Sequence, residues 1–171
     1  VPDQTPWDLF GAGNVNALTQ PQMVGWNILY NTPVCLNCHT PPEFTDHQFH
    51  NIGLRPSVED LGRELVTGNF SDRGRFKTPT LRNVGLRTRL MHVGWITDVQ
   101  DSIDFYNANS VFATGHVQFT LNQSPIPPAN ANYANIALPT QFQPMIVDFL
   151  VNGLTDPRVA AETFPFDRPT L

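Results

Sequence analysis

The sequence is poor in charge and in long apolar runs. Charged residues make up 15% of the 171 positions, the net charge is −5, and Lys77 is the only lysine. Nucleic acids and anionic membrane surfaces attract clustered basic side chains, so we expect neither as a partner. No stretch approaches the roughly eighteen consecutive apolar residues that a membrane span needs, and we expect no such span.

Cysteine is equally scarce, because the chain has only Cys35 and Cys38. They stand in the run C-L-N-C-H, which ends at His39. A C-x-x-C-H motif is typical of c-type haem attachment, in which both thiols form thioethers and the histidine binds the iron. A zinc site would need two further ligands at short spacing, and a thioredoxin-like redox pair would need a βαβ pattern. Neither is visible, so the motif predicts one covalent haem c.

The length indicates a single domain that is large enough to bury a core without disulfides. Sixteen prolines and eleven glycines favour long ordered loops between few helices. We expect an irregular N-terminal lead at 1–19 and the domain itself at 20–171. Covalent haem is attached outside the cytoplasm, and a chain that opens on valine looks processed. We therefore expect a bacterial periplasmic or otherwise exported protein.

Apolar periodicity and capping residues predict about five helices. Thr19 is the expected N-cap of the first, and Ser57 with Asp60 gives the second a capping signature. Gly68 and Gly153 are expected C-terminal stops. A long polar, proline-bearing excursion at 107–139 shows no helical period. The predicted helices lie at 20–31, 57–68 and 80–86, from 97 or 98 onward, and at 140–153.

Three stretches after the motif resemble the dihaem cytochrome c peroxidase family, which includes MauG. They are F-H-N-I-G-L at 49–54, G-R-F-K-T-P-T-L-R-N-V at 74–84, and M-H followed by glycine at 91–94. The resemblance is to the C-terminal haem domain of that family and covers about 20–171. It implies an all-α, cytochrome c-like domain with about five helices and long ordered loops around one covalent haem.

Members of that family carry two haems in two domains, whereas this sequence has one C-x-x-C-H motif. The resemblance therefore implies a redox partner protein, or a second haem-bearing chain or domain.

The sixth iron ligand implied by the resemblance is Tyr106, fourteen residues beyond His92. A phenolate is a hard anionic ligand that favours ferric iron, whereas the methionine of the peroxidases favours ferrous iron. Met91 and an open or water-bound position remain alternatives, and Tyr106 could instead be an amphipathic helix residue at the edge of the core. Met145 is expected in the core. The remaining histidines are expected to be hydrogen-bonding struts or surface residues: His47, His50, His92 and His116.

Cations near the haem-side loop could pair with buried haem propionates, which need compensating charge. The candidates are Arg75 and Arg82, with Lys77 equally well explained as part of a solvated basic patch. Together with the haem ligands, the predicted cofactor-binding residues are Cys35, Cys38, His39, Arg75, Arg82 and Met91, and the predicted iron ligands are His39 and Tyr106.

Two functions of different classes fit these residues. The first is a c-type haem protein that transfers or stores electrons for another redox centre. The alternative is a peroxidase or oxidase subunit, which would need an open iron position and a distal acid–base group. Nothing in the sequence singles out any carboxylate for that role among Glu43, Glu59, Glu64 and Glu162.

Overall fold

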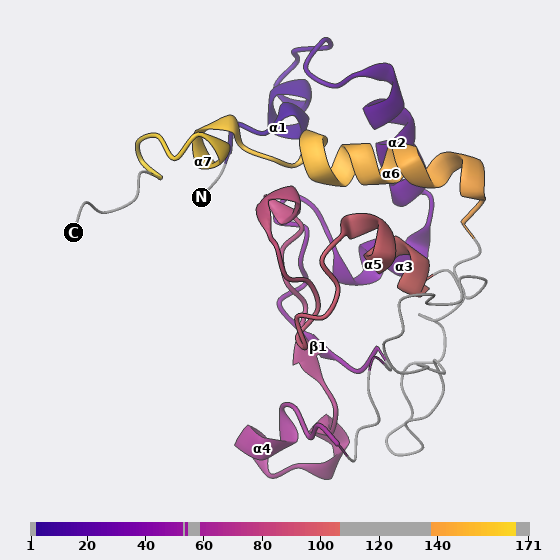
Figure 1. Ribbon diagram of the computed structural model, residues 1–171, viewed down its shortest axis with the longest axis vertical. Coiled ribbons are helices and arrows are strands. Elements are labelled where there is room, and N and C mark those ends of the chain that lie inside the picture. Colours follow the sequence, from indigo (N-terminus) through magenta and orange to yellow (C-terminus); the bar gives the residue numbers. More distant parts are fainter. Residues whose placement is uncertain (1–2, 53, 55–58, 107–137, 167–171) are drawn as a thin grey trace.

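The computed structural model describes residues 3–52, 54, 59–106 and 138–166. Their regular secondary structure is mostly helical, with one small sheet (Figure 1). The α-helices are α1 (Pro6–Gly11), α2 (Gln20–Tyr30), α3 (Pro33–Cys38), α4 (Glu64–Thr67), α5 (Val99–Tyr106), α6 (Gln143–Asp148) and α7 (Pro157–Ala160). The strands are β1 (Phe49–His50) and β2 (Phe76–Lys77), and short 3-10 or π segments are η1 (Phe70–Asp72), η2 (Val84–Leu86), η4 (Thr140–Phe142) and η5 (Phe149–Gly153).

Helix α2 confirms the first predicted helix and its cap. The Thr19 hydroxyl accepts from the Gln22 amide, and the Gln22 side chain accepts from the Thr19 amide, which forms a reciprocal capping box. Gly25 lies where α2 crosses α6. A Cβ added there would stand 2.0 Å from the carbonyl oxygen of Met145, so only glycine allows the two backbones to approach this closely.

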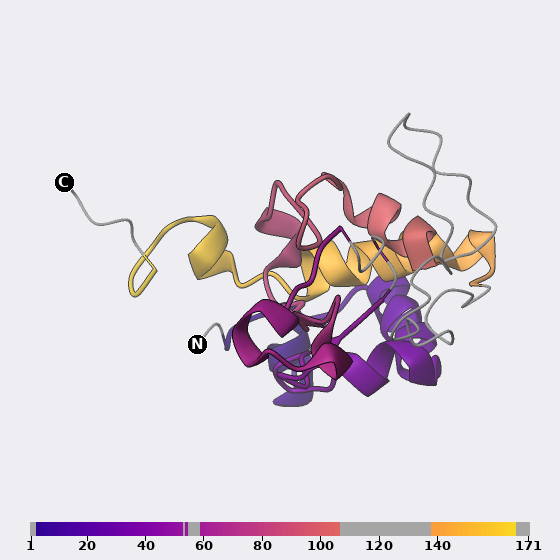
Figure 2. The ribbon, with the colours of Figure 1, turned by 90° about the horizontal axis from the view of Figure 1, so that it is seen from below.

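The last predicted helix is also confirmed, although its geometry varies along its length. It begins as the 3-10 turn η4, continues as α6, and widens into the π turn η5 before ending at Gly153. Ile146 and Phe149 on this helix are fully buried. Seen from below, α5 lies along α6, so the predicted fourth helix packs on the last one (Figure 2).

The N-terminal lead is not wholly irregular, because the helix α1 forms at Pro6–Gly11, and this corrects that part of the prediction. Thr5 caps α1 by accepting from the Asp8 amide, and the Asp8 carboxylate accepts from the Thr5 amide at 3.0 Å. Pro6 in the first turn is already set to a helical backbone angle. The T-P-W-D sequence at 5–8 therefore forms a capping box, which starts the helix α1.

The second and third predicted helices are too long. Ser57 lies outside the described residues, and the helix begins only at Glu64, because the carboxylate of Asp60 accepts from the Gly62 amide in a turn. Its predicted stop is confirmed, since Gly68 takes a left-handed φ of 65°. In the third, only the 3-10 turn η2 forms, because Asn83 before it has a left-handed φ of 59°.

A two-stranded antiparallel sheet corrects the all-α expectation. Strand β1 pairs with β2, and Phe49 faces Lys77 while His50 faces Phe76. Both strands have two residues and lie inside motifs on which the family resemblance rests. The chain between them carries α4 and η1 in a lobe at the bottom of Figure 1.

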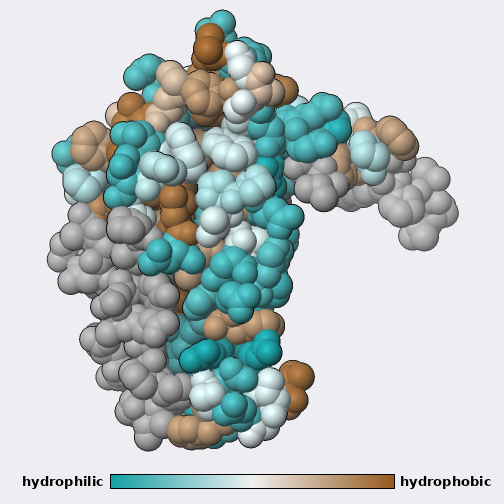
Figure 3. All heavy atoms as spheres, turned by 180° about the vertical axis from the view of Figure 1, so that it is seen from behind, coloured by the Kyte–Doolittle hydropathy of each residue, from teal (hydrophilic) through white to brown (hydrophobic). Residues whose placement is uncertain are grey.

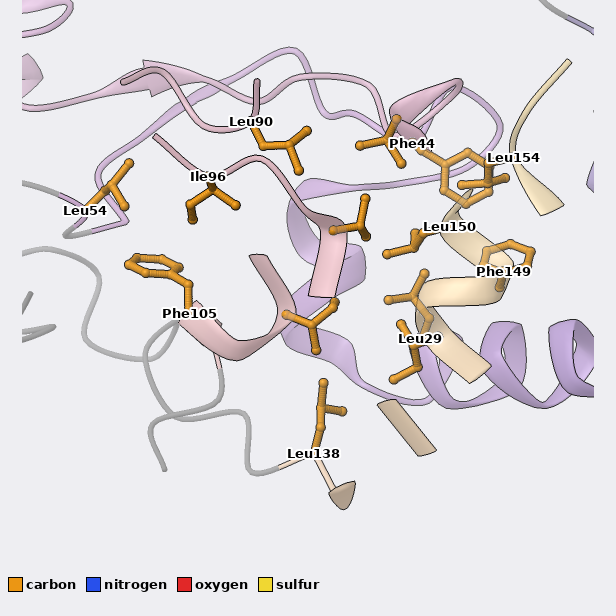
Figure 4. Packing of buried hydrophobic residues seen from close by; sticks show 14 of the residues in the cluster. Leu29, Phe44, Leu54, Leu90, Ile96, Phe105, Leu138, Phe149, Leu150 and Leu154 are labelled. Carbon is orange, nitrogen blue, oxygen red and sulfur yellow. The ribbon is translucent and has the colours of Figure 1, made fainter. Parts of the chain in front are cut away.

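The core is formed by apolar residues of several elements. Figure 4 shows Leu29, Phe149 and Leu150 in one group, with Phe44 and Leu154 beside them, and Leu54, Leu90, Ile96 and Phe105 in a neighbouring group. Aromatic ring contacts pack α1 against this core. Trp7 meets Phe44 edge-on at 5.0 Å and Trp26 at 5.8 Å between ring centroids.

Most of the excursion predicted at 107–139 lies outside the described residues. Among the described helices, none is long and apolar enough to cross a bilayer. On the face seen from behind, apolar surface appears as separate patches among hydrophilic side chains (Figure 3).

The C-terminal helix α7 projects from the body beside the N-terminus (Figure 1). The buried carboxylate of Asp156 holds the two ends of the chain together. It accepts from the Gln4 amide at 3.1 Å, from the Arg158 amide at 2.9 Å and from the Arg158 guanidinium at 2.6 Å. Hydrogen bonds from Arg158 outweigh burial and lower the pKa of Asp156 to about 2.

This carboxylate gives a prediction about acid stability. Because its pKa in the folded state lies below its ordinary value, Asp156 stabilises the fold above about pH 4 and loses that contribution as the pH falls towards 2. After allowance for solvent around Arg158, we expect Asp156→Asn to lower the free energy of unfolding by roughly 1–2 kcal/mol at pH 7 and by less at pH 2.5. Urea denaturation at the two pH values measures this difference. Asp101→Asn on α5 is the matched control, and equal losses at both pH values would contradict the prediction.

Candidate haem site

The C-x-x-C-H motif forms the short helix α3 and the residue after it. Cys35 and Cys38 are partly buried and form no disulfide with each other. Their positions three residues apart place them on neighbouring turns of one helix face. Burial, together with the nearby Cys38 thiol, raises the pKa of Cys35 to about 11. A catalytic redox pair of the thioredoxin type lowers the pKa of its thiol, so this environment does not favour that use of the motif.

His39 is oriented by a hydrogen bond to the backbone. Its Nδ1 lies 3.0 Å from the carbonyl oxygen of Phe44. Because a carbonyl only accepts, Nδ1 must carry the proton, and Nε2 then holds the lone pair that can bind a metal. Burial lowers the pKa of His39, which favours the neutral imidazole that ligation requires.

Tyr106 is the last residue of α5 and is half-buried against the core. Burial, followed by the charges that the thiols of Cys38 and Cys35 would carry, raises the pKa of its phenol. The phenol is therefore an electrostatic neighbour of both motif cysteines, although it lies 68 positions after Cys38 in the sequence. It stays protonated in this environment unless a cation binds the oxygen.

The two methionine candidates lie in different surroundings. Met91 has a left-handed φ of 58° in a tight turn, in which the Gly94 amide donates to its carbonyl oxygen, and its side chain packs against the core. Met145 is on α6, where its carbonyl meets Gly25. Met145 was predicted as a core residue, but its side chain is only half-buried and does not belong to the described hydrophobic core, so this prediction is not confirmed.

Arg82 is 7% exposed and has well-defined protein partners. Its two terminal nitrogens donate to the two carboxylate oxygens of Asp8, each at 2.7 Å, and its Nε donates to the Pro42 carbonyl oxygen at 2.8 Å. Burial acts against it, but the hydrogen bonds from Arg82 and Thr5 lower the pKa of Asp8. Pairing of Arg82 with a haem propionate stays a prediction, and in the structure this side chain joins α1 to the loop after the motif.

The other two predicted cations are more exposed. The backbone of Arg75 pairs with that of Gly62, and its side chain is half-buried. Lys77 is exposed, and its Nζ lies 3.2 Å from Nδ1 of His47, whose Nε2 is 2.5 Å from the Glu43 carboxylate. The surface placement predicted for His47 is therefore confirmed, and Lys77 is exposed, while pairing of Lys77 with a propionate stays a prediction.

His92 packs as a strut, while His116 lies outside the described residues. The His92 ring stacks on Phe76 with centroids 3.5 Å apart, and its Nε2 lies 3.4 Å from the Asp60 carboxylate. Asn51, Ile52 and Leu54 complete a small pocket around this stack.

His50, predicted as a hydrogen-bonding strut, is confirmed as one by its contact with Asp46, but sequence reasoning missed that the pair lies beside Cys38. Nε2 of His50 lies 2.6 Å from the Asp46 carboxylate. The Cys38 sulfur, a carboxylate oxygen of Asp46 and a ring nitrogen of His50 all lie within 4.8 Å of one another. Burial opposes the shift, but hydrogen bonds from the Gln48 amide and from His50 lower the pKa of Asp46. The i, i+4 spacing of the pair was the only available signal.

The residues that the structure brings together fit a covalently attached haem. Two unbridged thiols stand on one face of a short helix, and the next residue is a neutral imidazole whose Nε2 holds the lone pair. The Tyr106 phenol on α5 lies within electrostatic range of the same thiols. This donor set suits iron in a porphyrin better than a structural zinc ion, which would draw on four protein ligands.

Comparison with known proteins agrees with this interpretation, although no family model matches the chain. The sequence is 28% identical over 135 residues to the cytochrome-c peroxidase IdrP2 of Denitromonas iodatirespirans, an alignment that covers 63% of this chain and 37% of that protein. It is 32% identical over 115 residues to the methylamine utilization protein MauG of Methylophilus methylotrophus, with 65% and 34% covered. The chain thus spans about a third of the length of these relatives.

Among solved structures, the fold is similar to that of a MauG-like protein associated with microbial copper homeostasis. The TM-score is 0.78 and the identity is 23%, with 96% of this chain and 55% of that chain covered. This likeness shows the fold.

Proposed function

We propose that this chain, which is related to the dihaem cytochrome c peroxidases and to MauG, is a c-type haem domain that transfers or stores electrons. The observation that carries the proposal is the orientation of His39 by the Phe44 carbonyl, directly after two unbridged cysteines. When bound, the haem supplies an iron centre that accepts and releases one electron at a time. The protein supplies its attachment, orientation and electrostatic surroundings.

Each residue of the site has a distinct role in this proposal. The sulfurs of Cys35 and Cys38 would hold the porphyrin, and Nε2 of His39 would bind the iron. The carbonyl of Phe44 fixes the ring orientation of His39 and increases the basicity of Nε2, as outer hydrogen bonds do for metal-bound histidines. His39 and Tyr106 are both partly buried, and a low-polarity setting of this kind would influence the potential of a bound iron.

The proposed sixth ligand is Tyr106, and Tyr106→Phe tests it. A phenolate stabilises ferric iron more than a neutral ligand does, so its removal should shift the ferric absorption spectrum and raise the reduction potential. Tyr30→Phe is a control, because Tyr30 is 59% exposed and packs on Trp26. An unchanged ferric spectrum in Tyr106→Phe rules out ligation and leaves Met91 or an open position.

The alternative is a peroxidase or oxidase subunit, because relatives of this chain are named as peroxidases. Such an activity needs a group that moves a proton between the two oxygen atoms of peroxide. Of the four glutamates considered for that role, Glu43 pairs with His47 and Glu64 pairs with Arg73, so the structure singles out neither of these two for proton transfer. We propose that a second haem domain or chain would complete an enzyme of this kind, and that the protein is periplasmic.

Kinetics on the isolated haem-loaded chain separate the two functions. An electron-transfer domain should be reduced by a one-electron donor and reoxidised by an acceptor, with no peroxide-dependent oxidation of a reporter substrate. Peroxide turnover by this chain alone would overturn the electron-transfer proposal in favour of the enzyme.

A further inference from the structure

The pair formed by Asp46 and His50 lies beside Cys38 but does not itself hold the haem in the proposal above. We infer that this pair is a redox-linked proton site, in which the His50 imidazole takes up a proton when the haem gains an electron. This inference rests on the proposed function, because it requires a haem at Cys38.

The position of the pair relative to Cys38 supports the inference. The carboxylate oxygen and the ring nitrogen lie within 4.8 Å of the Cys38 sulfur and of each other. A haem held by that sulfur would bring its charge close to the pair.

The surrounding structure holds the pair in place. The Asp46 carboxylate accepts from the Gln48 amide at 2.9 Å and from His50, whose Nε2 lies 2.6 Å away, and the Thr78 hydroxyl also donates to it. The backbone of His50 is fixed opposite Phe76 by the sheet. A proton gained or lost here therefore changes charge at one fixed place beside the haem.

The pair is also buried enough for its charge to matter and exposed enough to exchange protons. The side chains of His50 and Asp46 are 22% and 16% exposed. Charges in such a setting are screened by salt much less than charges on the surface. Histidine is the side chain that most readily changes charge between pH 5 and 8.

The coupled step balances in charge and atoms. One electron enters from an external one-electron donor and reduces ferric to ferrous iron, while one proton moves from solvent to the imidazole. No bond between heavy atoms forms or breaks. The added negative charge at the haem favours the protonated imidazole. The reduction potential therefore falls as the pH rises and the imidazole loses its proton.

The other charged groups near the two-stranded sheet have partners other than Asp46 and His50. On β2, Lys77 directs its Nζ to His47, and Arg63 stands over the Phe49 ring at 4.0 Å. His47 and Glu43 form an exposed pair with the same i, i+4 spacing, 57% and 55% exposed. That pair is the matched control, because it shares the chemistry of Asp46 and His50 but is exposed to solvent.

The test is the reduction potential of the haem-loaded protein between pH 5 and pH 9. The wild-type potential should fall with pH by up to about 59 mV per unit, which corresponds to a tenfold change in the equilibrium constant for one electron. His50→Gln should remove most of this slope, whereas His47→Gln should keep it. Asp46→Asn keeps the shape of the side chain but removes its negative charge. It should raise the reduction potential at every pH and move the pH range in which the potential falls to lower pH.

The outcomes separate the inference from the proposed function. A chain without covalent haem overturns the proposed function. A haem-loaded wild type with a flat profile, or a His50→Gln variant that keeps the wild-type slope, overturns only the redox-linked proton site. If His50→Gln does not fold, a wild-type profile in Asp46→Asn overturns that site in the same way.

Discussion

Replacing both motif cysteines, as Cys35→Ser with Cys38→Ser, is expected to give a colourless protein whose mass is that of its amino acids. The two thiols are the only sulfurs in the chain that can form thioethers with a haem. The serine hydroxyl has a similar size but does not form that bond. Absorbance in the visible region and the mass of the intact protein measure the loss directly.

Two further variants sharpen this prediction. Asn37→Ser changes an exposed residue between the cysteines and should leave haem attachment unchanged. His39→Ala removes the proposed ligand but keeps both thiols, so any haem attached to it should show a spectrum without histidine ligation. A double cysteine variant that still carries covalent haem would show that attachment takes place elsewhere.

The second large effect concerns Arg82, whose removal should cost about 3–5 kcal/mol of stability, as loss of one partner of a buried ion pair does. Arg82→Ala leaves Asp8 without its two 2.7 Å hydrogen bonds and leaves the Pro42 carbonyl without a donor. The guanidinium also stands over the Trp7 and Phe44 rings, at 5.7 and 5.9 Å. Urea denaturation should show the loss as a lower midpoint.

Controls for Arg82 are available in the same loop and in its partner. Arg87→Ala alters an exposed arginine five positions later and should change the unfolding free energy by less than about 0.5 kcal/mol. In a double-mutant cycle, Asp8→Asn combined with Arg82→Ala should cost clearly less than the sum of the single losses. Additive losses would mean that the two side chains do not stabilise each other, and a propionate partner for Arg82 would then become the better explanation.

Local signals in the sequence predicted the helices that local interactions determine. The Thr19 cap, the start of α5 near Asp98, and the stop at Gly153 each depend on residues within one or two turns. The same signal was present at Thr5 with Asp8, but the α1 helix was missed because a short segment before the domain was interpreted as a lead.

Contacts between distant residues could not be predicted in this way. The β1 and β2 strands have two residues each, too few for an alternating pattern to show. Asp8, the partner of Arg82, lies 74 positions away in sequence. The haem motif had suggested a haem propionate as the partner of Arg82. The closeness of Asp46 and His50 to Cys38 depends on how the loop after α3 folds back.

Mass spectrometry of the natural protein, intact and after proteolysis, tests the covalent attachment of haem most directly. We expect a chain heavier than its amino acids by one haem, with that added mass on the peptide that contains residues 35–39. An unmodified mass for that peptide in a natively produced sample would contradict the proposed haem site.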